Sequence, residues 1–295
     1  MNDIGLGSAI SSMLARGLNK VPVRMSLLRI SESLATTIAS LVAMAVFGSA
    51  IVLFGWGPAL PSLYALMIFA VVGIVNAGVG RLFVWKSIAQ MGANRGNIVG
   101  STQNGLAIIF AFFFLGEAVT GWLIAGFALI LLAVIIILYD KSERSFTSKQ
   151  IRDGMIYGAM GAVCWGAGQD LMKAGITSYS DPIGASFLTF SFSMIFLVPY
   201  LFLRPGLKAT MSLRGARQPL LFAVLGGLIG NAGSFLSYVA LSYIPVTLVA
   251  TINAVNPIVT FMASYLLIRK SEGLNLRVFV SVLLAVTGLL MATLH

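Results

Sequence analysis

Long apolar stretches alternate along the chain with short connectors that hold most of its charged residues. Ten stretches can be delimited: Ile4–Leu18, Leu27–Phe54, Leu63–Trp85, Ile98–Leu115, Trp122–Tyr139, Gly154–Ala174, Ile183–Leu203, Leu220–Leu241, Val246–Ile268 and Val278–Leu294. Their apolar residues lack the alternation typical of barrel strands, which predicts membrane-spanning helices. Most have the roughly 20 residues that a helix needs to cross a bilayer. The first is too short, and we expect its missing length to lie upstream of Met1.

The composition agrees with an integral membrane protein. Residues AVILMFWYC make up 58% of the 295 positions and DEKR only 9%, a balance that soluble domains do not reach. Cys164 is the only cysteine and His295 the only histidine, which leaves neither a disulfide framework nor a Cys/His metal site. The sequence also lacks a nucleotide-binding glycine loop and a Ser/His dyad. We therefore expect no enzyme activity, no cofactor and no bound metal.

The two halves of the chain resemble each other. The polar segment Asp140–Asp153 separates residues 1–146 from residues 147–295, which we predict to be two five-helix repeats. An offset of 152 positions relates polar residues of the two halves, pairing Ser101 with Asn253 and Asn104 with Asn256. Because five helices are an odd number, the second half must insert upside down. The predicted fold is therefore an all-α membrane protein of about ten helices in two inverted repeats, the plan of many secondary transporters.

The basic residues fall on one side of this predicted topology. Of the 19 Lys and Arg residues, all but Arg29, Arg81 and Lys173 lie in or beside the connectors that follow odd-numbered helices. The positive-inside rule places these connectors in the cytoplasm and both termini outside it. The formal net charge of +10 is explained by this basic face, which attracts anionic lipid. Nucleic-acid binding is therefore not expected.

The stretch Gly154–Gly175 is apolar and yet carries Gln169, Asp170 and Lys173. A carboxylate in hydrocarbon is costly, so we expect Asp170 to face the bundle interior or a water-filled cavity. Asp170 and Lys173 lie at i and i+3, where they can pair; alternatively, Lys173 extends to the interface. A stripe of small residues on the same helix would let a neighbouring helix approach closely. Its members are Gly158, Ala162 and Gly166.

These features resemble the EamA-type members of the drug/metabolite transporter superfamily over nearly the whole chain. Besides the two halves, the resemblance rests on Trp165-Gly166 and on the fourth helix of each half. In that family the fourth helix carries a proline and ends in a Leu-Gly-Glu-like turn. Here the second half keeps Asn256-Pro257 and the first keeps Leu115-Gly116-Glu117, while Gly105 stands where the first half would have its proline. Family members usually have cytoplasmic termini, unlike the orientation that the charges predict.

The resemblance implies a central cavity lined by the first four helices of each half. It also implies a secondary transporter that moves a small organic metabolite by alternating access, most often outward. Amino acids, related metabolites and drug-like amphiphiles are the implied substrates. We expect a multi-pass protein of the inner or plasma membrane that can form a homo-oligomer. The alternative function is a membrane scaffold or lipid-handling subunit without a solute path.

Polar residues within the predicted spans are the candidates for substrate binding: Trp165, Gln169, Asp170, Asn76, Arg81, Ser101, Asn104, Asn231, Tyr238, Asn253 and Asn256. The asparagines equally suit hydrogen bonds that join helices. Arg81 suits a bidentate bond to a carboxylate or phosphate, or an extension to the basic interface, which we favour. Asp170 and Glu32 are candidates for proton coupling, unless a permanent pair with Lys173 occupies Asp170. Glu117, in a turn, is expected to be structural.

Overall fold

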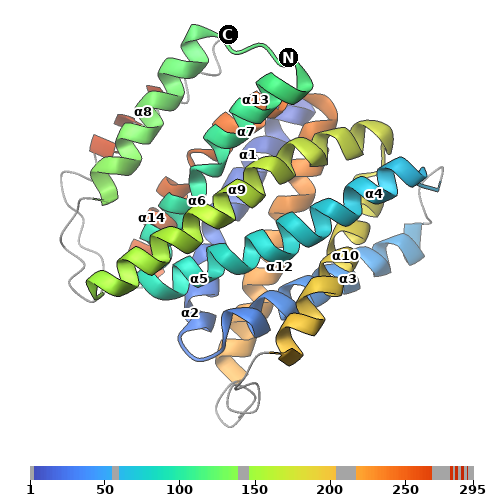
Figure 1. The fold of residues 1–295 in the computed structure, drawn as a ribbon, viewed down its shortest axis with the longest axis horizontal. Helices are drawn as coiled ribbons and strands as arrows, with labels where there is room; N and C mark the ends of the chain where they lie inside the picture. Colours follow the sequence, from blue (N-terminus) through green and yellow to red (C-terminus); the bar gives the residue numbers. More distant parts are fainter. Residues whose placement is uncertain are drawn as a thin grey trace.

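The structure, a computed structural model, describes residues 3–54, 60–138, 146–203 and 217–267, together with 280–281, 283–284, 287–288 and 291. These residues form helices joined by short turns, without a strand among them. The helices lie side by side in one bundle (Figure 1). Six of the described helices are long and apolar enough to cross a membrane: Glu32–Phe54, Leu63–Met91, Ala93–Leu115, Pro182–Leu203, Arg217–Tyr243 and Val246–Leu266.

The first half of the chain supplies helices one to five. The first is α1 (Asp3–Leu18) with α2 (Lys20–Leu27), and the second is α3 (Glu32–Phe54). The third is α4 (Leu63–Val71), the π-helical η1 (Val72–Gly80) and α5 (Arg81–Met91). The fourth is α6 (Ala93–Ser101), α7 (Gln103–Phe110) and the π-helical η2 (Ala111–Leu115). The fifth is α8 (Gly121–Leu138), at the edge of the bundle in Figure 1.

The second half repeats this order. The sixth helix is α9 (Ser148–Ser178), the seventh α10 (Pro182–Leu203) and the eighth α12 (Arg217–Tyr243). The ninth is α13 (Val246–Asn253) with α14 (Asn256–Leu267). The described residues of the expected tenth helix are helical, but its predicted ends, Val278 and Leu294, lie outside the described part of the chain. Large apolar side chains such as Val52 and Phe113 are 84% and 72% exposed, as a surface facing lipid requires. The protein is thus an integral, multi-pass membrane protein.

The first helix is longer than the sequence predicts. Asn19 N–H donates to the Ala15 carbonyl at 3.0 Å and Val23 N–H to the Asn19 carbonyl at 3.1 Å, so the helix runs on through α2. The expected shortness was wrong because Asn19 and Lys20 interrupt the apolar pattern and so mimic a connector. The extra length lies downstream of Leu18, and α3 begins at Glu32 rather than at Leu27.

The two halves contact each other in equivalent ways. The first helix of each half packs on the third helix of the other: α1 on α12, and α9 on α5. The second helices pack together as α3 on α10, and the fourth as α6 and α7 on α14 and α13. This exchange of equivalent partners is what a pseudo-two-fold axis between inverted repeats produces. It spreads the interface between the halves over the length of the bundle.

The fourth helix of each half breaks at the same place. The break lies at Thr102 in the first half and at Ala254–Val255, the expected offset of 152, in the second. Pro257 lacks an N–H and explains the second break. In the first half Gly105 occupies the matching position, where any side chain would overlap the Phe127 ring of α8. The backbone interruption is therefore common to both halves although the proline is not.

Small residues let α9 lie close to its neighbours, as predicted. A Cβ on Gly158 would come within 2.6 Å of Val99, and one on Gly166 within 2.8 Å of Leu106. α9 also begins with a capping box, in which Thr147 N–H donates to Gln150 Oε1 at 2.9 Å and Gln150 N–H to Thr147 Oγ1 at 3.3 Å. The predicted boundary between the halves, at residues 146 and 147, precedes this cap and stays a prediction.

Candidate functional site

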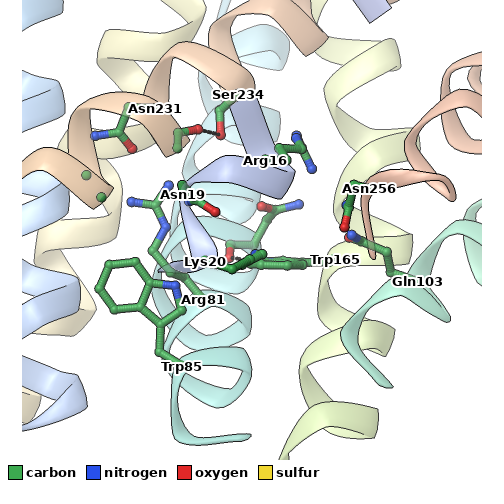
Figure 2. A pocket seen from close by; sticks show the side chains of 14 residues that line it. Arg16, Asn19, Lys20, Arg81, Trp85, Gln103, Trp165, Asn231, Ser234 and Asn256 are labelled. Carbon is green, nitrogen blue, oxygen red and sulfur yellow. Dashed lines mark hydrogen bonds between the residues drawn. The ribbon is translucent and has the colours of Figure 1, made fainter. Parts of the chain in front are cut away.

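A polar cavity lies between the two halves (Figure 2), and we call it the basic pocket. Its volume is about 40 Å³, room for a few water molecules. Residues of six helices line it: Arg16, Asn19, Lys20, Asn76, Arg81, Trp85, Gln103, Trp165, Gly226, Gly227, Gly230, Asn231, Ser234 and Asn256. Asn76, Gln103, Trp165, Asn231 and Asn256 each lie near the middle of their helices. The pocket is therefore half-way across the bundle.

Within the described part of the chain, three cationic side chains face this pocket and no lining residue is acidic. Lys20 is 3% and Arg81 8% exposed. Figure 2 shows Arg16, Lys20 and Arg81 around one space, with Lys20 beside the Trp165 ring. Arg81 does not extend to the interface, which corrects the favoured interpretation of this residue. Arg16 and Lys20, expected in a cytoplasmic connector, are also pocket residues, so the predicted orientation now rests on the remaining connector cations.

Aromatic rings and a hydroxyl hold the three cations. Lys20 Nζ lies 4.9 Å from the Trp165 ring centroid and Arg81 Cζ 4.9 Å from that of Phe190, within the range of cation–π attraction. Arg16 Nη2 donates to Ser237 Oγ at 3.0 Å. Arg81 Nη1 and Arg16 Nε are buried and have no hydrogen-bond partner among the residues that the structure describes. The pocket thus offers N–H groups that no other described residue of the protein accepts.

The π-helical η1 positions the first-half wall of the pocket. The Arg81 N–H donates to the Asn76 carbonyl, closing a wide turn, and the Trp165 Nε1–H of α9 donates to the same carbonyl at 3.0 Å. Gly80 permits this approach, because a Cβ there would lie 2.8 Å from Trp165 Cδ1. π-helical turns often occur at functional sites. Here the turn joins Asn76, Arg81 and Trp165 across the two halves.

On the opposite wall of the pocket, side-chain amides form hydrogen bonds that join neighbouring helices. Asn97 Nδ2 donates to Asn256 Oδ1 and to Thr260 Oγ1, both at 2.7 Å. Thr260 Oγ1 in turn donates to the Gly17 carbonyl at 2.9 Å. On α12, Asn231 Nδ2 donates to the Ala39 carbonyl at 2.7 Å, while Asn231 Oδ1 has no partner. Asn256 and Asn231 therefore both join helices and line the pocket.

The structure places five of the predicted binding residues in the pocket: Asn76, Arg81, Trp165, Asn231 and Asn256. The other six are not lining residues: Gln169, Asp170, Ser101, Asn104, Tyr238 and Asn253. Three of these six form hydrogen bonds elsewhere in the bundle. Ser101 Oγ donates to the Ile98 carbonyl and Asn104 Nδ2 to the Ser101 carbonyl, while the Tyr238 and Thr189 hydroxyls bond each other. The buried amide of Asn253 has no partner.

Asp170 and Lys173 do not form the expected pair. Lys173 Nζ donates to the carbonyls of Leu241 at 2.6 Å and Ile244 at 3.3 Å. These carbonyls lie at the C-terminal end of α12, where unpaired acceptors and the helix dipole favour a cation. Both Asp170 carboxylate oxygens are buried and find no hydrogen-bond partner in the described ranges of the chain. Lys173 lines a second, open cavity of about 620 Å³ with Glu117, outside the basic pocket.

The two other acidic candidates also lie outside the basic pocket. The Glu117 carboxylate accepts the N–H groups of Val246 and Thr247, both at 2.8 Å. It therefore caps α13 from the opposite half, which agrees with the expected structural role. Glu32, at the start of α3, lines a separate cavity of about 150 Å³ with Lys86 and Gln90.

Sequence reasoning missed part of the pocket. The missed side chains are those of Arg16, Asn19, Lys20, Trp85 and Gln103. One signal was available for the first helix, because Arg16 and Lys20 lie at i and i+4 and apolar residues resume after them. A helix continued through Leu27 would have placed both cations on one face of a span.

Comparisons with known proteins agree with this architecture. A family model described as the EamA-like transporter family matches residues 3–139 and again residues 152–294. A solved structure described as "Crystal structure of protein" has a TM-score of 0.72 to this one at 17% identity, covering 99% of this chain and 95% of its own. At that identity the likeness supports the fold alone. No match was found among curated proteins. The two family matches, one to each half, make this chain a member of the EamA-like transporter family of the drug/metabolite transporter superfamily, and hence a membrane transporter.

Proposed function

We propose that this protein is a secondary active transporter that moves a small organic metabolite through the basic pocket by alternating access. The observation that carries the proposal is the position of the pocket. Residues of both halves line it near the middle of their helices, for example Asn76 and Trp165 from one wall and Asn231 from another. Inverted-repeat transporters bind their substrates at such a place. Export is the direction that the family resemblance favours.

The size of the pocket supports alternating access. Its volume of about 40 Å³ is well below the roughly 300 Å³ or more that ligand sites usually offer. A metabolite therefore needs the walls to separate before it can bind. Because the halves exchange equivalent contacts, rocking one against the other would open the pocket at one end while closing it at the other.

Asp170 is the proposed site of proton coupling. Its carboxylate is buried without a hydrogen bond, and Lys173 on the next turn is bound to α12 carbonyls instead. A carboxylate within a span is costly to bury, and such residues often serve as proton relays in transporters. Glu32 is the weaker candidate because it lies at the end of α3, in a cavity with Lys86.

Proteoliposomes test both parts of the proposal. The purified protein in phosphatidylcholine vesicles should take up at least one member of a metabolite panel saturably, and an imposed pH gradient should change the rate. Asp170→Asn should abolish the response to the gradient while facilitated exchange persists. The control is Asp153→Asn, in the first turns of the same helix and paired with Arg152 at 3.3 Å. Saturable uptake from no panel member would favour the scaffold or lipid-handling alternative, and an unchanged gradient response in Asp170→Asn would exclude its coupling role.

A further inference from the structure

We propose that the transported solute is a small organic anion, whose carboxylate or phosphate is bound by Arg81 and Lys20 with Arg16 beside them. This inference rests on the proposed function and adds the chemical class of its substrate. It follows from the charge of the basic pocket, from the hydrogen-bonding groups left unused in it, and from the nature of its walls.

Among the residues that the structure describes, no acidic side chain compensates the charge of the pocket. Arg16, Lys20 and Arg81 face one cavity that has no acidic lining residue, although cations within a membrane span are costly to bury and usually pair with carboxylates. Glu117 does not face them, because it lines the second cavity with Lys173 and its two oxygens are held by N–H groups of α13. Asp170 does not line the pocket. A bound anion is the simplest source of the missing charge.

The unused donors match an oxyanion. Arg81 is 8% exposed, and its Nη1 is buried without a hydrogen-bond partner, as is Arg16 Nε. A guanidinium presents its N–H groups in a planar fork that fits carboxylate and phosphate oxygens. Lys20 Nζ, stacked over Trp165, adds a point charge that tolerates either group.

The rest of the pocket favours an organic solute over a simple ion. Asn19 Oδ1 and Asn231 Oδ1 are buried acceptors without partners, so the solute should also carry hydroxyl or ammonium donors. The Trp85 and Trp165 rings offer apolar faces to a short carbon skeleton. Together these groups describe a hydroxylated or amino-bearing anion. Drug-like amphiphiles are among the substrates that the family resemblance implies, and those with a positive charge would be repelled by the cations of this pocket.

A transport panel that differs only in charge tests the inference. Uptake of glycerol 3-phosphate, succinate and glutamate is measured in phosphatidylcholine vesicles, beside neutral glycerol and cationic choline. At least one anion should be taken up saturably and the neutral and cationic solutes should not. The responding anion distinguishes a phosphate from a carboxylate site. Uptake of choline or glycerol alone would leave the transporter proposal intact and overturn the anion site, whereas uptake of none would count against both.

Charge variants locate the site. Arg81→Gln and Lys20→Gln should each raise the KM for the responding anion by about tenfold to a hundredfold, the usual effect of losing a charge-assisted bond. Arg81→Lys should recover part of the loss. Arg152→Gln is the control, since that side chain is 70% exposed at the start of α9. An unchanged KM in both pocket variants would overturn the assignment.

Two further measurements use the wild-type protein, so they do not depend on how well a variant folds. The first tests binding of the anion, and the second tests whether a lipid headgroup is the ligand. The responding anion should raise the Tm of the detergent-solubilised wild-type protein at a concentration near its KM, and chloride at the same ionic strength should not. An equal shift with chloride would point to a simple ion and contradict the organic-anion class. Phosphatidylglycerol added to the vesicles should leave the KM unchanged; competitive inhibition by this lipid would identify a headgroup site and overturn a soluble substrate.

Discussion

Two regions of this bundle hold buried or half-buried charged side chains, and these side chains are used in opposite ways. In the second cavity, both charged side chains of the described lining form hydrogen bonds with backbone groups. Lys173 binds the last carbonyls of α12, and Glu117 caps α13. In the basic pocket, Arg81 and Arg16 retain N–H groups without partners. Charges that satisfy helix ends stabilise the fold, whereas charges left unsatisfied destabilise it unless a ligand completes them. The contrast separates structural charge from functional charge.

The largest expected effect comes from removing a functional charge. Lys20→Met replaces the side chain by an unbranched apolar one that is one atom shorter and deletes a buried cation. Transport of the responding anion should therefore fall at least about tenfold. The folded protein should nevertheless gain about 1–3 kcal/mol, because apolar replacements of poorly compensated buried charges are often stabilising. The uptake assay checks the predicted loss of transport, and thermal unfolding in detergent checks the predicted gain in stability. A lower Tm together with normal transport would place Lys20 among the structural charges.

Glu117→Ala should act in the opposite sense. The substitution leaves the N–H groups of Val246 and Thr247 without their acceptor, at a cost of about 1–3 kcal/mol of stability. The Tm should therefore fall by several degrees, while the KM of the transported solute stays unchanged. Asp153→Ala is the comparison, because its pairing with Arg152 at the surface is worth less than about 1 kcal/mol. A raised KM with an unaltered Tm would show that Glu117 belongs to the transport path.

The contrast also explains how far the sequence could predict this structure. Apolar stretches and the offset of 152 predicted the spans and the two repeats, because burial in lipid imposes the same rule on each segment. They could not reveal where a cation points. Lys173 appeared to have a partner in Asp170, but it binds carbonyls 68 and 71 residues away. Lys20 looked like a connector residue, and its side chain faces the pocket only because the first helix packs on α12.

The fourth helices of the two halves also combine features that the sequence could predict with features that depend on packing. The break in the ninth helix has a visible cause in the sequence, because Pro257 removes a backbone donor. The equivalent break at Thr102 had no such signal, since the reason for Gly105 is the Phe127 ring of a neighbouring helix. For the asparagines, the sequence left binding and helix joining open. Asn256 does both in space, lining the pocket while accepting from Asn97.

The smallest expected effect concerns that amide contact. Asn97 is 2% exposed and donates to Asn256 and Thr260 across the halves, and such bonds within membranes are worth about 0.6–2 kcal/mol. Asn97→Ala should lower the Tm by a few degrees and change the KM less than the Lys20 variant does. Ser101→Ala removes only a bond to the Ile98 carbonyl of its own helix and should have almost no effect. Asn256 and Thr260 both lie on α14, so Asn97 on α6 can bond them only while the fourth helices of the two halves are together. Loss of this contact should therefore also change the rate of exchange. If the Asn97 and Ser101 variants behaved alike in both measurements, the contact between the fourth helices would hold neither the fold nor the closed state of the pocket.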